Sequence, residues 1–216
     1  MKKGSTELVF ILDKSGSMAG LEADTIGGYN SMLEKQKALE GECRITTVLF
    51  NNNYRILHDR IDIRAVSSIT DEEYSVGGST ALLDAVGTTI RKIANVQKHT
   101  ADAYRAEKVM FVIITDGEEN SSREFSAEQV RRMIEHQKTH YGWEFVFLGA
   151  NIDAVETAGR FGISADRAQN YHADSDGIEI NFRVISETVA AFRESSMPED
   201  WNEEIQKDYK KRGQGK

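Results

Sequence analysis

The sequence predicts one α/β domain over residues 1–196, built on a mostly parallel β-sheet with helices on both faces. Apolar runs at 8–12 and 109–114 are typical of central strands that are buried on both faces. Runs of this kind alternate along the chain with segments of helical periodicity, which is the pattern of parallel α/β sheets. With 216 residues, the chain is long enough for one sizeable α/β domain and too short for two comfortable ones.

The first part of the chain predicts a strand, a helix and a hairpin. The strand covers residues 7–12. Apolar residues then recur at mostly three- and four-residue spacing over 18–33, which predicts an amphipathic helix, and Gly27-Gly28 within it indicates close packing on the sheet. The β-rich run 44–50 and the alternating run 54–63 are separated by three asparagines. Together these runs predict a hairpin whose second strand lies at an edge of the sheet.

The middle of the chain predicts a second helix and a second central strand. A capping box formed by Thr70 and Glu73 predicts a short helical turn before the loop that contains Gly77-Gly78. An apolar stripe over residues 82–94 predicts a helix, and the apolar run at 109–114 predicts the strand that follows it.

The next segments continue the alternation of helices and strands. A capping box at Ser126 predicts the start of a helix, and residues 145–148 predict a buried strand. A short helix is predicted over 153–159, and a last strand over 168–172. A regular apolar stripe then predicts a helix over 178–192.

Residues 197–216 are predicted to form a C-terminal amphipathic helix and tail that begins near Pro198. Acidic residues come early in this segment and basic residues come late, which matches the dipole of a helix. Trp201, Ile205 and Tyr209 recur at four-residue intervals and so share one helix face. This face indicates a helix packed on its own domain, and the alternative is a helix that docks a partner.

Composition argues against several classes of function. A formal net charge of −8 argues against nucleic acid as a partner, because binding phosphates requires a basic surface. No apolar run approaches the roughly 20 residues that a membrane span requires. Cys43 is the only cysteine, and the five apolar residues near the N-terminus are too few for a signal-peptide core. We therefore expect a reducing, cytoplasmic environment.

The most informative motif is Asp13-Lys14-Ser15-Gly16-Ser17, which directly follows the first predicted strand. Ligand sites in open α/β sheets lie just beyond the carboxyl ends of such strands. One carboxylate and two hydroxyls stand here at alternate positions, and oxygen ligands of this type suit Mg²⁺, Mn²⁺ or Ca²⁺. The alternative is an ordinary loop, because Asp and Ser are also common in turns and helix caps.

Two later segments offer further oxygen ligands. The glycine-rich loop after Gly77 contains Thr80 and leads into a predicted helix. The strand at 109–114 ends in Thr115-Asp116-Gly117, which places a second aspartate at a strand end. The chain therefore offers an Asp-x-Ser-x-Ser motif, a loop threonine and a second strand-end aspartate.

This set resembles the metal ion-dependent adhesion site of the von Willebrand factor type A domain family. That site consists of an Asp-x-Ser-x-Ser motif after the first strand, a threonine in a later loop, and an aspartate after the fourth strand. The resemblance implies that Ser15, Ser17 and Thr80 are hydroxyl ligands of the metal. It also implies that Asp13 and Asp116 are the two carboxylates of the site, which in this family often hold the ion through water.

The resemblance extends from about Glu7 to about Arg193 and implies both a fold and a function. The implied fold is a Rossmann-like, doubly wound, mostly parallel sheet with one antiparallel edge strand, which fits the predicted hairpin. The implied function is a protein-interaction module, not an enzyme. Its divalent cation, Mg²⁺ or alternatively Mn²⁺ or Ca²⁺, would join the domain to an aspartate or glutamate of a protein partner.

Other functions remain as alternatives at this stage. The chain would be a metal-assisted phosphoester hydrolase if Glu118 or Glu119 acted as an acid or base near the ion. It would be a scaffold domain if the metal were only structural. His136 and His140 are spaced as a zinc-binding pair on a helix, but a position near a helix C-terminus favours histidine for electrostatic reasons, so we interpret both as structural.

Overall fold

The computed structural model describes residues 1–213, without the side chains of residues 2 and 3, and confirms the predicted fold class. In this part of the chain the sheet has six strands in the order β3-β2-β1-β4-β5-β6. β3 pairs antiparallel with β2, and the other neighbours pair in parallel. The strands are β1 (Lys2–Asp13), β2 (Glu42–Phe50), β3 (Tyr54–Asp62), β4 (Ala106–Thr115), β5 (Glu144–Gly149) and β6 (Ala168–Asn170).

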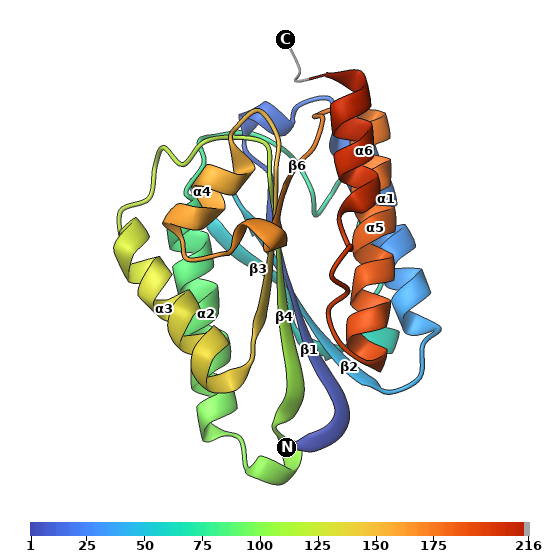
Figure 1. Ribbon diagram of the computed structural model, residues 1–216, viewed down its shortest axis with the longest axis vertical. Helices are drawn as coiled ribbons and strands as arrows, with labels where there is room; N and C mark the ends of the chain where they lie inside the picture. Colours follow the sequence, from blue (N-terminus) through green and yellow to red (C-terminus); the bar gives the residue numbers. More distant parts are fainter. Residues whose placement is uncertain (214–216) are drawn as a thin grey trace.

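Helices cover both faces of the sheet (Figure 1). One face is covered by α1, α5 and α6, and the other by α2, α3 and α4. The helices are α1 (Glu22–Lys37), α2 (Leu82–His99), α3 (Ala127–Tyr141), α4 (Ala154–Arg160), α5 (Ser175–Glu194) and α6 (Glu203–Arg212). Among residues 1–213, no helix combines the length and apolarity needed to cross a bilayer.

The central strand β1 contributes to both hydrophobic cores. Leu8, Phe10 and Leu12 pack with α1 and α5, while Val9 and Ile11 pack on the opposite face with α2. All five side chains are almost completely buried, and each such burial contributes about 1.5–3 kcal/mol relative to exposure. This two-sided burial explains the unbroken apolar run in the sequence.

The predicted adjacency of the two longest apolar strands is confirmed. β1 and β4 are parallel neighbours, with Leu8 opposite Met110 and Leu12 opposite Ile114. Their carboxyl ends therefore lie side by side, at the point where the strand order changes direction. Such a switch point leaves a crevice between the loops that follow the two strands.

Two local predictions require correction, and a third is confirmed. The first helix begins at Glu22 instead of Met18, because Gly16–Met18 form a separate 3-10 turn that belongs to the loop after β1. The short turn predicted at Thr70 is present: the Tyr74 N–H donates to the Thr70 carbonyl at 3.1 Å, and the Thr70 N–H donates to Glu73 Oε2 at 2.7 Å, as in a capping box. The last strand ends at Asn170 and is shorter than predicted.

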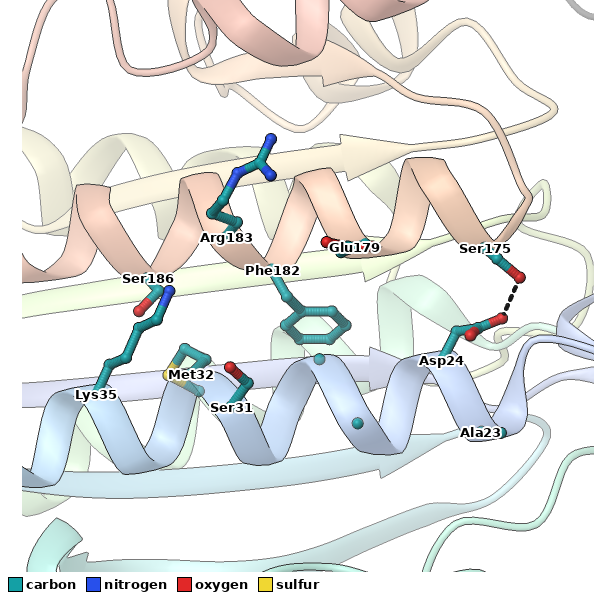
Figure 2. A pocket seen from close by; sticks show the side chains of 12 residues that line it. Ala23, Asp24, Ser31, Met32, Lys35, Ser175, Glu179, Phe182, Arg183 and Ser186 are labelled. Atoms are coloured by element: carbon teal, nitrogen blue, oxygen red, sulfur yellow. Dashed lines mark hydrogen bonds between the residues drawn. The ribbon is translucent and has the colours of Figure 1, made fainter.

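Gly28 is a contact point between α1 and α5, which corrects the expected packing on the sheet. A Cβ at this position would lie 2.4 Å from Cδ2 of Phe182, so only glycine allows the helices to approach so closely. Phe182 points from α5 toward α1 in Figure 2, in a pocket of about 340 Å³ between the two helices. At one end of this pocket, the Ser175 hydroxyl donates to Asp24 at 2.6 Å.

The C-terminal helix α6 packs on the domain. It begins at Glu203, later than predicted from Pro198, and Trp201 lies in the turn before it. Trp201 and Ile205 are buried, and the Trp201 indole N–H donates to the Asp166 carbonyl at 2.8 Å. These contacts support the packed interpretation over the docking helix. The division at residue 196 stays a prediction, and residues 214–216 of the predicted tail lie outside the described residues.

We predict that Trp201→Ala lowers the free energy of unfolding by about 3–5 kcal/mol, because it removes a buried aromatic side chain and its hydrogen bond. Urea or thermal unfolding measures the change. Tyr104→Ala is the matched control, because Tyr104 is 65% exposed and its loss should change stability by no more than about 0.5 kcal/mol. Equal stability of the Trp201 variant and the parent would contradict the packed role of this segment.

Candidate metal centre

Asp13 stands at the end of β1, and its hydrogen bonds shape the surrounding loops. Its Oδ1 accepts from the Ser15 backbone N–H at 2.7 Å, and its Oδ2 accepts from the Thr115 hydroxyl at 2.6 Å. Its carbonyl accepts from the Tyr74 hydroxyl at 2.5 Å. The side chain is almost completely buried. Asp13 therefore joins the loop that carries Ser15 and Ser17, called here the serine loop, to the end of β4.

A continuous path of hydrogen bonds connects the serine loop to the second aspartate. The hydroxyls of Ser15 and Ser17 lie 3.0 Å apart, and the Ser17 hydroxyl donates to Asp116 Oδ1 at 2.6 Å. The other oxygen, Asp116 Oδ2, is buried and has no hydrogen-bond partner among the described residues. A buried carboxylate oxygen without a partner is costly, and it marks a position suited to a cation.

Thr80 completes the group from a third segment of the chain. A Cβ built on Gly117 would lie 3.1 Å from Ser17 Oγ and 3.4 Å from Thr80 Oγ1, so both hydroxyls border the same small space. Thr80 is buried, like Ser15, whereas Ser17 is exposed. The structure thus brings together the five residues that the sequence singled out, and their role as metal ligands stays a prediction.

The loop that carries Thr80 is held against the serine loop by backbone contacts. The Gly77 N–H donates to the Lys14 carbonyl at 2.9 Å, and the Gly16 N–H donates to the Gly78 carbonyl at 3.0 Å. Gly78 has a φ of +81°, and a Cβ there would lie 2.1 Å from Oδ1 of Asn52. This position therefore requires glycine, which explains the Gly77-Gly78 pair.

Asn120 is a positioning residue that the sequence did not reveal. Its Oδ1 accepts from the Thr80 N–H at 2.9 Å, and its own N–H donates to the Thr80 carbonyl at 3.0 Å. This reciprocal pair fixes the threonine loop to the loop after β4. An asparagine four residues beyond a strand-end aspartate gives no periodic signal, so only the folded structure identifies it.

Glu119 and Asp84 hold the same loop to the start of α2. Glu119 Oε2 accepts from the Leu83 N–H at 2.9 Å and from the Ser122 hydroxyl at 2.7 Å. Asp84 accepts from three successive backbone N–H groups at residues 123–125. Both carboxylates are therefore engaged as caps. Glu118, in contrast, is exposed.

The electrostatics of the centre favour a cation. Burial raises the pKa of Asp13 above its ordinary value, and burial together with the charge of Asp13 raises the pKa of Asp116 to about 6. Without a cation, ionisation of Asp116 therefore destabilises the fold. The free energy of unfolding falls as the pH rises from 3.8, the ordinary pKa of aspartate, through about 6. Two desolvated carboxylates and three hydroxyls fit a hard divalent cation.

The donor set depends on hydroxyl oxygens. Within residues 1–213, no three or more His, Cys, Asp or Glu side chains gather in a metal-binding arrangement. Three of the five candidate ligands here, Ser15, Ser17 and Thr80, are hydroxyls. Oxygen sets of this kind suit magnesium, calcium or manganese.

Comparison with known proteins assigns the family. A sequence model described as the von Willebrand factor type A domain matches residues 7–181. The chain belongs to this family. This family match confirms the fold that the motifs predicted. A search of curated proteins finds no match to this von Willebrand factor type A domain.

Solved structures share the fold of this von Willebrand factor type A domain at low sequence identity. A point mutant of the PilB minor pilin from Streptococcus sanguinis gives a TM-score of 0.61 at 11% identity, over 90% of this chain and 64% of that one. A von Willebrand factor type A protein from Catenulispora acidiphila gives a TM-score of 0.58 at 16% identity, over 87% of this chain and 43% of that one. The manganese-loaded TRAP protein of Plasmodium vivax gives a TM-score of 0.58 at 17% identity, over 84% of this chain and 74% of that one. The chain thus spans less than two thirds of the first two proteins, and these likenesses show the fold alone.

We predict that Asn120→Ala weakens Mg²⁺ or Mn²⁺ binding, because the Thr80 loop loses the acceptor that orients it. Groups that position metal ligands typically matter by about 10–100-fold in affinity. Asn120→Asp keeps the acceptor and should bind the cation at least as well as the parent. Calorimetric titration with each cation measures the effect.

The exposed Asn53 provides a matched control for this experiment, and Asn53→Ala should titrate like the parent protein. If Asn120→Ala binds both cations with the affinity of the parent, Asn120 has no positioning role in the candidate centre.

Proposed function

We propose that this von Willebrand factor type A domain is a metal-dependent binding module for proteins. Domains of this family are generally protein-interaction modules. The observation that carries the metal dependence is the convergence of three hydroxyls and two buried carboxylates, one of which has an oxygen without a partner. The manganese-loaded TRAP neighbour is consistent with this proposal.

The proposed recognition follows from how charge is divided among the ligands. Ser15, Ser17 and Thr80 would bind the cation directly and the two aspartates partly through water, so the direct ligands are mostly neutral and leave much of the charge of a divalent cation uncompensated. When bound, the cation would supply an open coordination position for an acidic side chain of a protein partner. Asp13 holds the serine loop and Asp116 holds the Ser17 hydroxyl, so the two carboxylates keep the hydroxyls in place. Mg²⁺ is our first choice of ion, with Mn²⁺ and Ca²⁺ as alternatives.

The positions of the nearby acids support a binding role over hydrolysis. Glu119 is engaged by backbone and hydroxyl donors at the start of α2, so it is not poised to accept a proton from a water. Glu118 is exposed and belongs to an acidic rim. We therefore propose that the chain is not an enzyme. Turnover of a generic phosphoester in Mg²⁺ or Mn²⁺ that is lost in Asp116→Asn would overturn this part of the proposal.

We predict that divalent cations stabilise the fold, because they compensate two buried carboxylates. A cation concentration of about 100 times the Kd adds about 2.7 kcal/mol to the free energy of unfolding. For a domain of this size that corresponds to a rise in Tm of roughly 5–10 °C. Thermal unfolding with Mg²⁺, Mn²⁺ or a chelator measures it, and Asp13→Asn should reduce the rise. An unchanged Tm at millimolar concentrations of both cations would contradict the proposed centre.

We also predict that Asp13 and Thr80 have separable effects. Asp13→Ala should weaken the binding of the cation itself by about 10–100-fold, since Asp13 supplies charge and holds the serine loop. Thr80→Ala removes one neutral oxygen from a separate loop and should reduce the binding of an acidic peptide more than that of the cation. Calorimetry measures the cation, and water-proton relaxation of bound Mn²⁺ measures displacement of water by the peptide.

Two outcomes would contradict the bridging model. One is an Asp13→Ala protein that binds cations like the parent. The other is a bound Mn²⁺ whose water relaxation is unaffected by acidic peptides at millimolar concentration, with peptides in which Gln and Asn replace Glu and Asp as the matched control.

A further inference from the structure

A second cavity lies at the opposite end of the sheet from the candidate metal centre. It has a volume of about 940 Å³ and is bordered by α2, α3 and the start of β4. The two helices lie side by side on one face of the sheet (Figure 1). Its volume falls within the range of roughly 300–1,000 Å³ that is typical of small-molecule sites. None of its lining residues belongs to the candidate metal centre.

The floor of the cavity is apolar and includes an aromatic side chain. Trp143, just before β5, lines it while being only 5% exposed. The indole is held in place by stacking on Phe111, with ring centroids 5.5 Å apart. Ala94 from α2 and Val109 from β4 extend the apolar lining. This apolar floor is suited to packing against the ring of a small molecule.

The two helices that border the cavity contribute basic side chains. Arg91 and Lys98 come from α2, and His136 and His140 come from α3, with the two imidazole centroids 4.3 Å apart. Lys98 and His140 stand in the last turns of their helices, where the helix dipole favours them. Arg91 and His136 lie before those last turns, so the dipole does not account for them.

The acids in the cavity wall are already engaged. Asp102 pairs with Arg105 at 2.9 Å, and Glu107 accepts from the Gly4 backbone N–H at 2.6 Å. Arg91 approaches an acid, Glu124, only at 4.0 Å. The cavity therefore keeps an excess of positive charge, although the chain as a whole has a net charge of −8.

One buried acceptor in the wall has no partner. Gln97 is 6% exposed and lines the cavity, and its Nε2 donates to Glu7 at 3.3 Å. Its Oε1 is buried and has no hydrogen-bond partner in residues 1–213. Such an acceptor is satisfied when a ligand offers an N–H or O–H donor.

We propose that this cavity binds a small planar aromatic anion. The ring would pack against the apolar floor formed by Ala94, Val109 and the exposed edge of Trp143, and the acidic group would lie between the basic side chains of α2 and those of α3. A polar N–H or O–H on the ring would satisfy Gln97 Oε1. Carboxylate and phosphate share the chemistry that these side chains recognise, because both accept charge-assisted hydrogen bonds.

A matched series of naphthalenes tests the proposal: 1-naphthoate, 1-naphthyl phosphate and the uncharged 1-naphthalenemethanol. The titrations use the full chain in the presence of a chelator, so that the acidic probes do not bind through a cation. Saturation-transfer NMR detects binding and calorimetry measures it. We expect both anions to bind about tenfold or more tightly than the alcohol, and their order identifies the preferred acidic group.

Substitutions then locate the site. Lys98→Gln and His140→Gln, both at exposed positions that leave the core intact, should weaken binding of the better anion by about three- to tenfold each. Lys210→Gln on α6 makes the same change of charge at a distant exposed position and should bind like the parent. The proposal is overturned if the alcohol binds as well as the anions, if no probe binds at millimolar concentration, or if the α2 and α3 variants match the Lys210 control.

Discussion

The hydrogen bonds of Asp13 are the interaction on which the rest of the candidate site depends. One carboxylate oxygen accepts from the Ser15 backbone and the other accepts from the Thr115 hydroxyl, so the serine loop and the end of β4 are tied to one group. The carbonyl of Asp13 also fixes Tyr74. Because this carboxylate is 1% exposed, losing these donors would leave a charge buried without compensation. These hydrogen bonds therefore hold the serine loop against the carboxyl ends of β1 and β4.

The strand order explains why the oxygens gather at this edge. The chain leaves β1 toward α1 on one face of the sheet and leaves β4 toward α3 on the other, so the two loops diverge and open a crevice. The loop that carries Thr80 borders this crevice, held by backbone contacts to Lys14 and Gly16 and by the reciprocal hydrogen bonds of Asn120. The basic cavity lies at the opposite end of the sheet, near the amino ends of the parallel strands. The oxygen ligands and the cationic side chains are therefore separated by the length of the strands.

The sequence alone determined the features that depend on local chemistry. The apolar runs of β1 and β4 identified central strands, because burial on both faces requires apolar residues at every position. The capping box at Ser126 was predicted correctly, because a capping side chain bonds to a backbone N–H only three residues away. Asp13 and Asp116 were identified as candidate ligands because each stands directly after such a strand.

Tertiary structure decided the contacts between distant segments. The bonds between Asn120 and Thr80, and between Thr115 and Asp13, join residues 40 and 102 positions apart. The close approach of Phe182 to Gly28 decided that this glycine contacts α5 and not the sheet. The reason is physical: periodicity in a sequence records which face of an element is buried, whereas the segment that covers that face is chosen by shape and hydrogen bonding in the assembled fold.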